Sequence, residues 1–155
     1  LAAFAAPEGT FSVYLFVITD CPIANSYAPW IAEFAHSLRD TPVAVSLVHV
    51  DPDISAEHAQ QHARDYQLDL PILLDPDQVL AQAVGATVTP MAAVISARGL
   101  EYLGRIDDRW PRRGVDGQVA AHHDLQDAVQ ALLRGDSVPN PRTEAVGCRL
   151  PQRAP

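Results

Sequence analysis

The two cysteines are the residues best suited to covalent chemistry in this 155-residue chain. Cys21 lies directly after an apolar, β-branched run over residues 11–19 and directly before a helical pattern that begins near Ile23. The N–H groups at a helix start stabilise a thiolate, which is the reactive form of cysteine, and Pro22 is tolerated in a first helical turn. The carboxylate of Asp20 opposes this effect. We therefore predict that Cys21 is a reactive thiol, with an inert buried thiol as the alternative.

Cys148 is the second cysteine and lies in a proline- and arginine-rich stretch that begins at Asp136. The residue three positions after Cys21 is Ala24, so the Cys-x-x-Cys pair is missing and Cys148 is the one intrachain thiol that can resolve an intermediate on Cys21. A tail that closes over the helix start would permit a disulfide if the two Cα atoms come within about 7 Å. We favour a reversible Cys21–Cys148 disulfide. A permanent structural disulfide and two unconnected thiols are the alternatives.

Six histidines raise the question of a metal site. His58 and His62 are four residues apart, a ligand spacing on one helix face, whereas adjacent His122 and His123 point in different directions on a helix. A solvated helix surface accounts for the first pair, and a position at a helix N-cap accounts for the second. We therefore predict neither a metal site nor a cofactor. Copper bound by Cys21 and a histidine is the alternative.

A scaffold of alternating strands and helices must position these side chains. Strands are predicted over residues 11–19, 43–50, 71–74, 91–96 and 100–106. Helices are predicted over residues 23–38, with a kink at Pro29, and over 55–66, 78–84 and 124–133. Ser55 is a predicted N-cap, and Gly85 and Gly135 are predicted to end their helices. This order predicts an α/β sandwich with one mixed sheet flanked by helices.

Length and composition limit the classes of protein that this chain can represent. We expect residues 1–135 to form one domain and residues 136–155 to form an extended tail that packs on it. The longest apolar run, Val13–Ile18, is much shorter than the roughly 20 residues of a membrane span. The net charge of −8 disfavours nucleic acid and anionic membranes as partners.

Three local features resemble the thioredoxin-like superfamily, and in particular redoxin domains of the AhpC/TSA type with an Asp-Cys-Pro-Ile-x-Asn segment. That segment is residues 20–25 here. Thr89-Pro90 precedes the predicted hairpin, where such folds carry a cis-proline that faces the active cysteine, and Gly99 lies in the hairpin turn. The resemblance covers about residues 11–133 and implies a thioredoxin-like three-layer α/β sandwich.

The resemblance also implies functions for residues around the thiol. In these folds the residue before the cis-proline presents its backbone to a bound partner, so Thr89 and Pro90 are expected to contact substrate, together with Pro22. The loop after the hairpin lies at the edge of the active site in this family. Arg105 or Arg109 is therefore expected to hold a thiolate or peroxide by its charge. A solvated loop with internal salt bridges is the alternative for Arg105.

The chain departs from the better-known members at three positions. Ile18 lies three residues before Cys21, where typical peroxiredoxins carry threonine or serine, and Thr19 is offset by one. Ala24 replaces the second cysteine of thioredoxin-type enzymes, and Asn25 replaces the second cysteine of copper-delivering Sco-type relatives. The missing hydroxyl at Ile18 slightly favours disulfide exchange over peroxide reduction.

We therefore predict a thiol-based oxidoreductase in which Cys21 attacks a disulfide or a hydroperoxide and Cys148 or an external thiol resolves the intermediate. The expected partners are a thiol or disulfide protein, or a small hydroperoxide, and an external thiol reductant. The first alternative is a non-catalytic redoxin-like module of a larger chain that binds copper or a partner protein through Cys21. The second is a structural domain with a fixed disulfide.

The start of the chain and the cysteine pair bear on the compartment. The chain begins at Leu1, and the small residues of Leu1–Ala6 resemble the end of a signal peptide, which is the alternative interpretation. We favour ordinary sequence, because no positive charge precedes these residues and Pro7–Thr10 is typical of a turn before a strand. An oxidisable cysteine pair is easier to maintain outside the cytoplasm, so the sequence slightly favours a periplasmic or other extracytoplasmic location.

Overall fold

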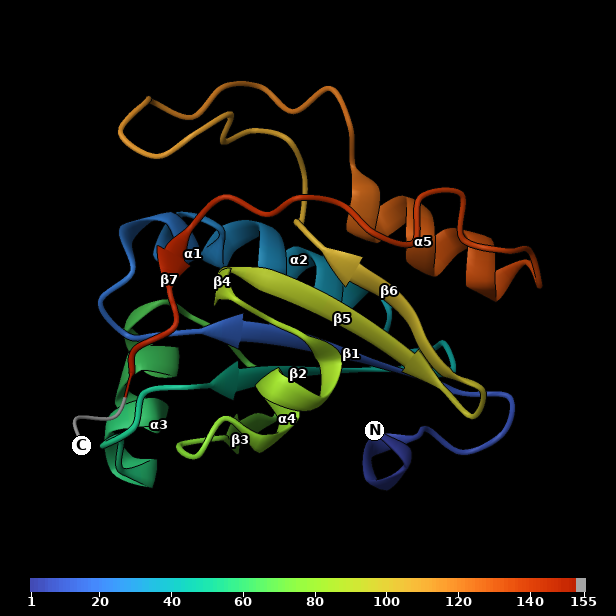
Figure 1. Cartoon of the computed structure of the whole chain (residues 1–155), viewed down its shortest axis with the longest axis horizontal. Helices are drawn as coiled ribbons and strands as arrows, with labels where there is room; N and C mark the ends of the chain where they lie inside the picture. Colours follow the sequence, from blue (N-terminus) through green and yellow to red (C-terminus); the bar gives the residue numbers. More distant parts are fainter. Residues whose placement is uncertain (153–155) are drawn as a thin grey trace.

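A central five-stranded sheet organises the computed structural model, which describes residues 1–152. The strand order is β3-β2-β1-β5-β6 (Figure 1). β1, β2 and β3 run parallel, and β5 and β6 are antiparallel to their neighbours, so the sheet is mixed as predicted. The strands of this sheet are β1 (Phe11–Val17), β2 (Val43–His49), β3 (Ile72–Leu74), β5 (Met91–Ser96) and β6 (Gly99–Gly104).

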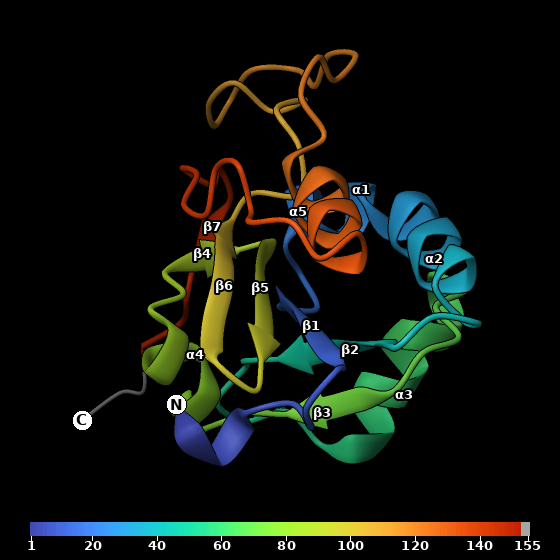
Figure 2. The same cartoon turned by 90° about the vertical axis from the view of Figure 1, so that its right-hand side faces the viewer.

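Helices cover both faces of this sheet. They are α1 (Pro22–Ser26), α2 (Ala28–Ser37), α3 (Ala56–Asp65), α4 (Val79–Val84) and α5 (Asp124–Leu133), and a short 3-10 turn, Ala2–Phe4, precedes β1. In Figure 2, α2 and α5 lie on one side of the sheet and α4 lies on the other. The result is the predicted three-layer α/β sandwich. Among residues 1–152, no helix combines the length and apolar character needed to cross a bilayer.

β1 is the central strand and leads directly to Cys21. It pairs with β2 on one side and β5 on the other, and Val13, Leu15 and Phe16 on it are fully buried. All six residues of β5 are buried as well. A strand that is covered on both faces needs such a continuous apolar sequence. Packing on both faces and pairing on both edges therefore hold the end of β1 rigidly in the core.

The segment after β1 corrects two predictions. β1 ends at Val17, two residues earlier than expected, and a turn leads to Cys21. The single kinked helix predicted over residues 23–38 is wrong, because α1 ends at Ser26 and α2 begins at Ala28. Pro29 stands in the first turn of α2, where a missing N–H removes no helical hydrogen bond. The proline therefore starts a new helix instead of bending an existing one.

The segment after α5 returns along the edge of the domain. β7 (Cys148–Arg149) pairs antiparallel with β4 (Val88–Thr89), and Cys148 is the direct partner of Thr89. Figure 1 shows β7 beside β4 and next to α1. Leu150, just beyond β7, is buried. Residues 153–155 of the tail predicted over 136–155 lie outside the described residues.

Thr143 anchors the tail upstream of β7. Its Oγ1 accepts the backbone N–H of Arg105 at 3.1 Å and shares a hydrogen bond with the Tyr102 hydroxyl at 2.7 Å. Its own N–H donates to the carbonyl oxygen of Leu103 at 3.2 Å. A Cβ on Gly104 would overlap Thr143, so the glycine permits this close approach. The tail is therefore held along β6 before it reaches β4.

Replacing Thr143 with valine is expected to lower the free energy of unfolding by about 1–3 kcal/mol, because the Arg105 N–H loses its acceptor while the side-chain volume is kept. Urea denaturation measures this loss. The exposed Thr87, adjacent to β4, provides the matched control, and Thr87→Val is expected to change stability by less than about 0.5 kcal/mol. Equal losses in the two variants would contradict an anchoring function of Thr143.

Candidate active site

Cys21 occupies the N-cap position of α1 and is fully buried. Its Sγ accepts the N–H of Ala24 at 3.4 Å and donates to the carbonyl oxygen of Thr89 at 3.2 Å. The Thr89-Pro90 peptide bond is cis, which confirms the prediction. Pro22 is the first residue of α1 and is exposed. The structure thus brings together the thiol, the helix start and the cis-proline segment.

Cys148 joins this group from the tail. Both cysteines are free thiols, but Cys21 is buried whereas Cys148 is partly exposed. Burial, a hydrogen bond to the Cys21 thiol and the charge of a Cys21 thiolate all raise the pKa of Cys148. The charge of Asp20 acts in the same direction and that of Arg113 in the opposite one. Cys148 therefore keeps its proton at neutral pH.

Gly147 makes the approach of Cys148 to Cys21 possible. A Cβ at this position would overlap the carbonyl group of Thr89, the same group that accepts the hydrogen bond from Cys21. Any other residue would push β7 away from β4. The sequence singled out the neighbouring cysteine but not this glycine, because the contact joins segments that are far apart in the chain.

Asn25 supports the turn that carries Cys21. Its Nδ2 donates to the carbonyl oxygen of Thr19 at 2.9 Å, and its Oδ1 lies 2.8 Å from Nε2 of His62. The carboxylate of Asp51 accepts the N–H of Thr19 at 3.3 Å. Side chains from α3 and from the segment just after β2 therefore fix the turn that precedes Cys21.

The predicted solvated surface for His62 is wrong, although His58 is exposed as expected. The His62 ring is buried and lies 5.0 Å from the ring of His49, edge to face, and 4.9 Å from that of Tyr66. His123 is the N-cap residue of α5, but no capping bond comes from its side chain. Within residues 1–152, no group of three or more histidine, cysteine or acidic side chains is arranged to hold a metal ion.

The buried His62 predicts a stability loss in acid. Burial, followed by the charge of His49, lowers the pKa of His62. The unfolded chain therefore takes up a proton below about pH 6.5 that the folded chain resists, and the free energy of unfolding falls as the pH decreases. Urea denaturation at about pH 7 and about pH 5 is expected to show a smaller loss for His62→Gln, whose amide can still donate to Asn25. His58→Gln is the control, and its free energy of unfolding should fall with pH as much as that of the wild type. Equal decreases in His62→Gln and His58→Gln would contradict the prediction.

The arginines after β6 are engaged in ion pairs. Nε of Arg105 donates to Asp124 at 2.7 Å, a hydrogen bond that raises the pKa of Arg105. Arg109 forms a two-pronged pair with Asp107, which also accepts the hydroxyl of Tyr27 at 2.6 Å. The guanidinium of Arg109 lies over the Tyr27 ring, 4.3 Å from its centroid. The structure thus places Arg105 against α5, and its contact with substrate stays a prediction.

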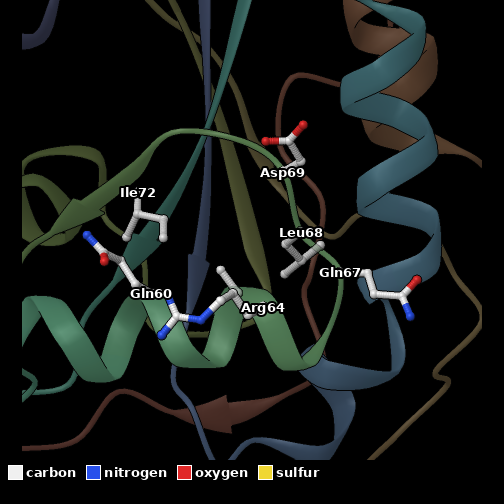
Figure 3. A pocket seen from close by; sticks show the side chains of 7 residues that line it. Gln60, Arg64, Gln67, Leu68, Asp69 and Ile72 are labelled. Atoms are coloured by element: carbon white, nitrogen blue, oxygen red, sulfur yellow. The ribbon is translucent and has the colours of Figure 1, made fainter.

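A pocket between α3 and β3 lies apart from the thiols (Figure 3). It is lined by Gln60, Ala63, Arg64, Gln67, Leu68, Asp69 and Ile72. Cys21, Thr89 and Cys148 are not among these lining residues. The pocket is therefore separate from the site where thiol chemistry can occur.

Solved structures identify the class of fold. A hypothetical protein from Sinorhizobium meliloti is similar at 27% identity and a TM-score of 0.80, over 96% of this chain and 82% of that one. An uncharacterized conserved protein from Geobacillus kaustophilus matches at 22% identity and a TM-score of 0.79, over 94% and 79% of the two chains. A secreted Mycobacterium tuberculosis disulfide oxidoreductase homologous to E. coli DsbE matches at 21% identity and a TM-score of 0.57, over 80% and 83%. The fold is thioredoxin-like.

The family follows from the sequence match. Residues 1–101 match the AhpC/TSA family, so this chain belongs to it. The matched part contains Cys21 and Thr89-Pro90 and ends before Cys148. No curated protein matches the chain.

Proposed function

We propose that this protein is a thiol–disulfide oxidoreductase with Cys21 as nucleophile and Cys148 as resolving cysteine. The observation that carries the proposal is the pairing of β4 with β7, which places Cys148 directly opposite Thr89, the residue whose carbonyl oxygen accepts the hydrogen bond from the Cys21 thiol. Thiol–disulfide exchange needs a thiolate and a second thiol within reach of it. Cys21 at the start of α1 supplies the first thiol and Cys148 on β7 supplies the second, without a Cys-x-x-Cys pair.

The reaction proceeds in two exchanges. The Cys21 thiolate attacks a substrate disulfide, forms a mixed disulfide with one substrate sulfur and releases the other as a thiolate. Cys148 then loses its proton and attacks Sγ of Cys21, which forms the Cys21–Cys148 disulfide and releases the second substrate thiolate. The substrate gains two electrons, and an external thiol later returns them to the protein.

The surroundings of Cys21 support this order. The N–H of Ala24 points at Sγ of Cys21 and stabilises negative charge on it. Burial raises the pKa of the Cys148 thiol. Ile18, three residues before Cys21, is buried and offers no hydroxyl to orient a peroxide. β7 pairs with β4 over two residues only, so a local opening of this short ladder gives substrate access to buried Cys21.

A redox titration tests the proposal. The protein is equilibrated in glutathione buffers of graded ratio, alkylated and measured by mass spectrometry. We expect a reversible loss of two hydrogens, and trypsin should yield a disulfide-linked pair of the peptides over residues 1–39 and 143–149. Cys21→Ser and Cys148→Ser serve as controls without the intramolecular bond. Absence of the bond, or a bond that excess reduced glutathione leaves intact, would contradict the proposed cycle.

A further inference from the structure

The two sulfur atoms differ in how an external thiol can reach them. Thiol–disulfide exchange requires the attacking sulfur to approach along the line of the bond that breaks, from the side opposite the leaving sulfur. Cys21 is fully buried, and Ala24 and Thr89 already contact its sulfur. Cys148 is partly exposed. The line of attack therefore runs through the packed core for Cys21 and from solvent for Cys148.

The backbone of the tail closes the remaining approach to Cys21. Gly147 lies against the carbonyl group of Thr89 with no room even for a Cβ. On the other side of Cys148, Leu150 donates its N–H to the carbonyl oxygen of Thr87 at 3.3 Å and is itself buried. Cys148 is thus the accessible member of the thiol pair while β7 remains paired.

We propose that the reducing partner attacks Cys148 and expels Cys21 when the oxidised protein is reduced. This inference rests on the proposed function, since it requires the Cys21–Cys148 disulfide. A bond forms between the partner's sulfur and Sγ of Cys148, the Cys21–Cys148 bond breaks, and Cys21 leaves with the electron pair as a thiolate. A second partner thiolate then attacks the first partner sulfur and forms the partner disulfide. Cys148 leaves and takes a proton from solvent.

A hydrogen-bond donor beside Cys21 agrees with this direction. The N–H of Ala24, 3.4 Å from Sγ of Cys21, stabilises the negative charge that this sulfur takes up as it leaves. The two half-reactions therefore use different sulfurs: the substrate bonds to Cys21, after an opening of β7, and the reductant bonds to Cys148 without one.

Trapping the first product of reduction tests the inference. The oxidised wild-type protein is mixed with reduced glutathione and quenched within the first turnover with excess N-ethylmaleimide, and the tryptic peptides are analysed by mass spectrometry. We expect glutathione on the peptide of residues 143–149 and N-ethylmaleimide on that of residues 1–39. The reverse distribution would overturn the inference and leave the proposed function intact. Failure to form the starting disulfide would instead contradict the proposed function.

The same oxidised protein in concentrated guanidinium chloride is the matched control. Unfolding removes the burial of Cys21 and the contacts of β7, so glutathione should then appear on both cysteines. A preference for Cys148 that persists in the unfolded protein would show that the local sequence directs the attack, and would overturn the inference from the fold.

Discussion

Replacing Cys21 with serine is expected to reduce the turnover of a disulfide substrate to the background rate. A serine hydroxyl does not ionise near neutral pH and cannot form a mixed disulfide, so the first exchange is lost. Cys148→Ser is expected to retain the first exchange. The reaction should stop after one exchange, because the mixed disulfide on Cys21 is not resolved. An aromatic disulfide whose released thiolate absorbs light measures both effects. Reduced glutathione as the electron donor should give steady turnover in the wild type, and without this donor Cys148→Ser should give a single stoichiometric release.

The two variants control for each other, because each removes one thiol and keeps the other. Thermal unfolding under reducing conditions should show that both remain folded. Continued turnover in Cys21→Ser would show that Cys148 is the nucleophile. Unchanged turnover in Cys148→Ser would show that an external thiol resolves the intermediate. Either result would contradict the assigned roles.

Replacing Gly147 with alanine is expected to slow the formation of the Cys21–Cys148 disulfide by roughly 100-fold, because a displacement of about 1 Å is enough for such a loss between reacting groups. The added Cβ overlaps the Thr89 carbonyl group, so β7 must move away from β4. We also expect the free energy of unfolding of the reduced protein to fall by about 1–3 kcal/mol through overpacking. Timed alkylation after addition of oxidised glutathione measures the first effect, and urea denaturation measures the second.

Gly114→Ala is the matched control for this substitution. Gly114 lies in the loop after β6 with a positive φ of 74° and open space where a Cβ would stand. Its replacement costs about 1–2 kcal/mol for the backbone conformation and leaves β7 in place. Disulfide formation should therefore proceed at the wild-type rate. Equal rates in Gly147→Ala and the wild type would contradict the fit of β7 against Thr89.

The parts of the site that lie on strong local patterns could be predicted from the sequence. The apolar run before Cys21 places the cysteine at the end of a buried strand, and Pro22 marks the start of a helix. Ser55 caps α3 by accepting the N–H of His58, and Gly85 ends α4 with a positive φ, both as predicted. The cis bond before Pro90 followed from resemblance, since local sequence alone rarely predicts a cis isomer.

Other parts depend on contacts that local patterns do not encode. His62 follows the exposed Gln61 in a polar helix, and the buried face of α3 is marked only by Ala59 and Ala63, whose small side chains give a weak apolar signal. Only glycine fits at position 147, because a Cβ there would overlap the carbonyl group of Thr89, which is distant in the sequence. Arg105 carries a charge that suits an anionic substrate, yet its hydrogen bond goes to Asp124, and tertiary packing decides between such partners.

The tail is attached to the domain without any covalent bond between the cysteines. Thr143 and Leu150 hold it on either side of Cys148, and Gln78 donates to the carbonyl oxygen of Pro151 at 2.7 Å. Each thiol thus meets the other at a high effective concentration that the fold, and not diffusion, provides. We expect the oxidised and reduced proteins to have the same backbone conformation. The protein would then store an electron pair without a conformational change. A partner could then distinguish the two forms only through the sulfur atoms themselves.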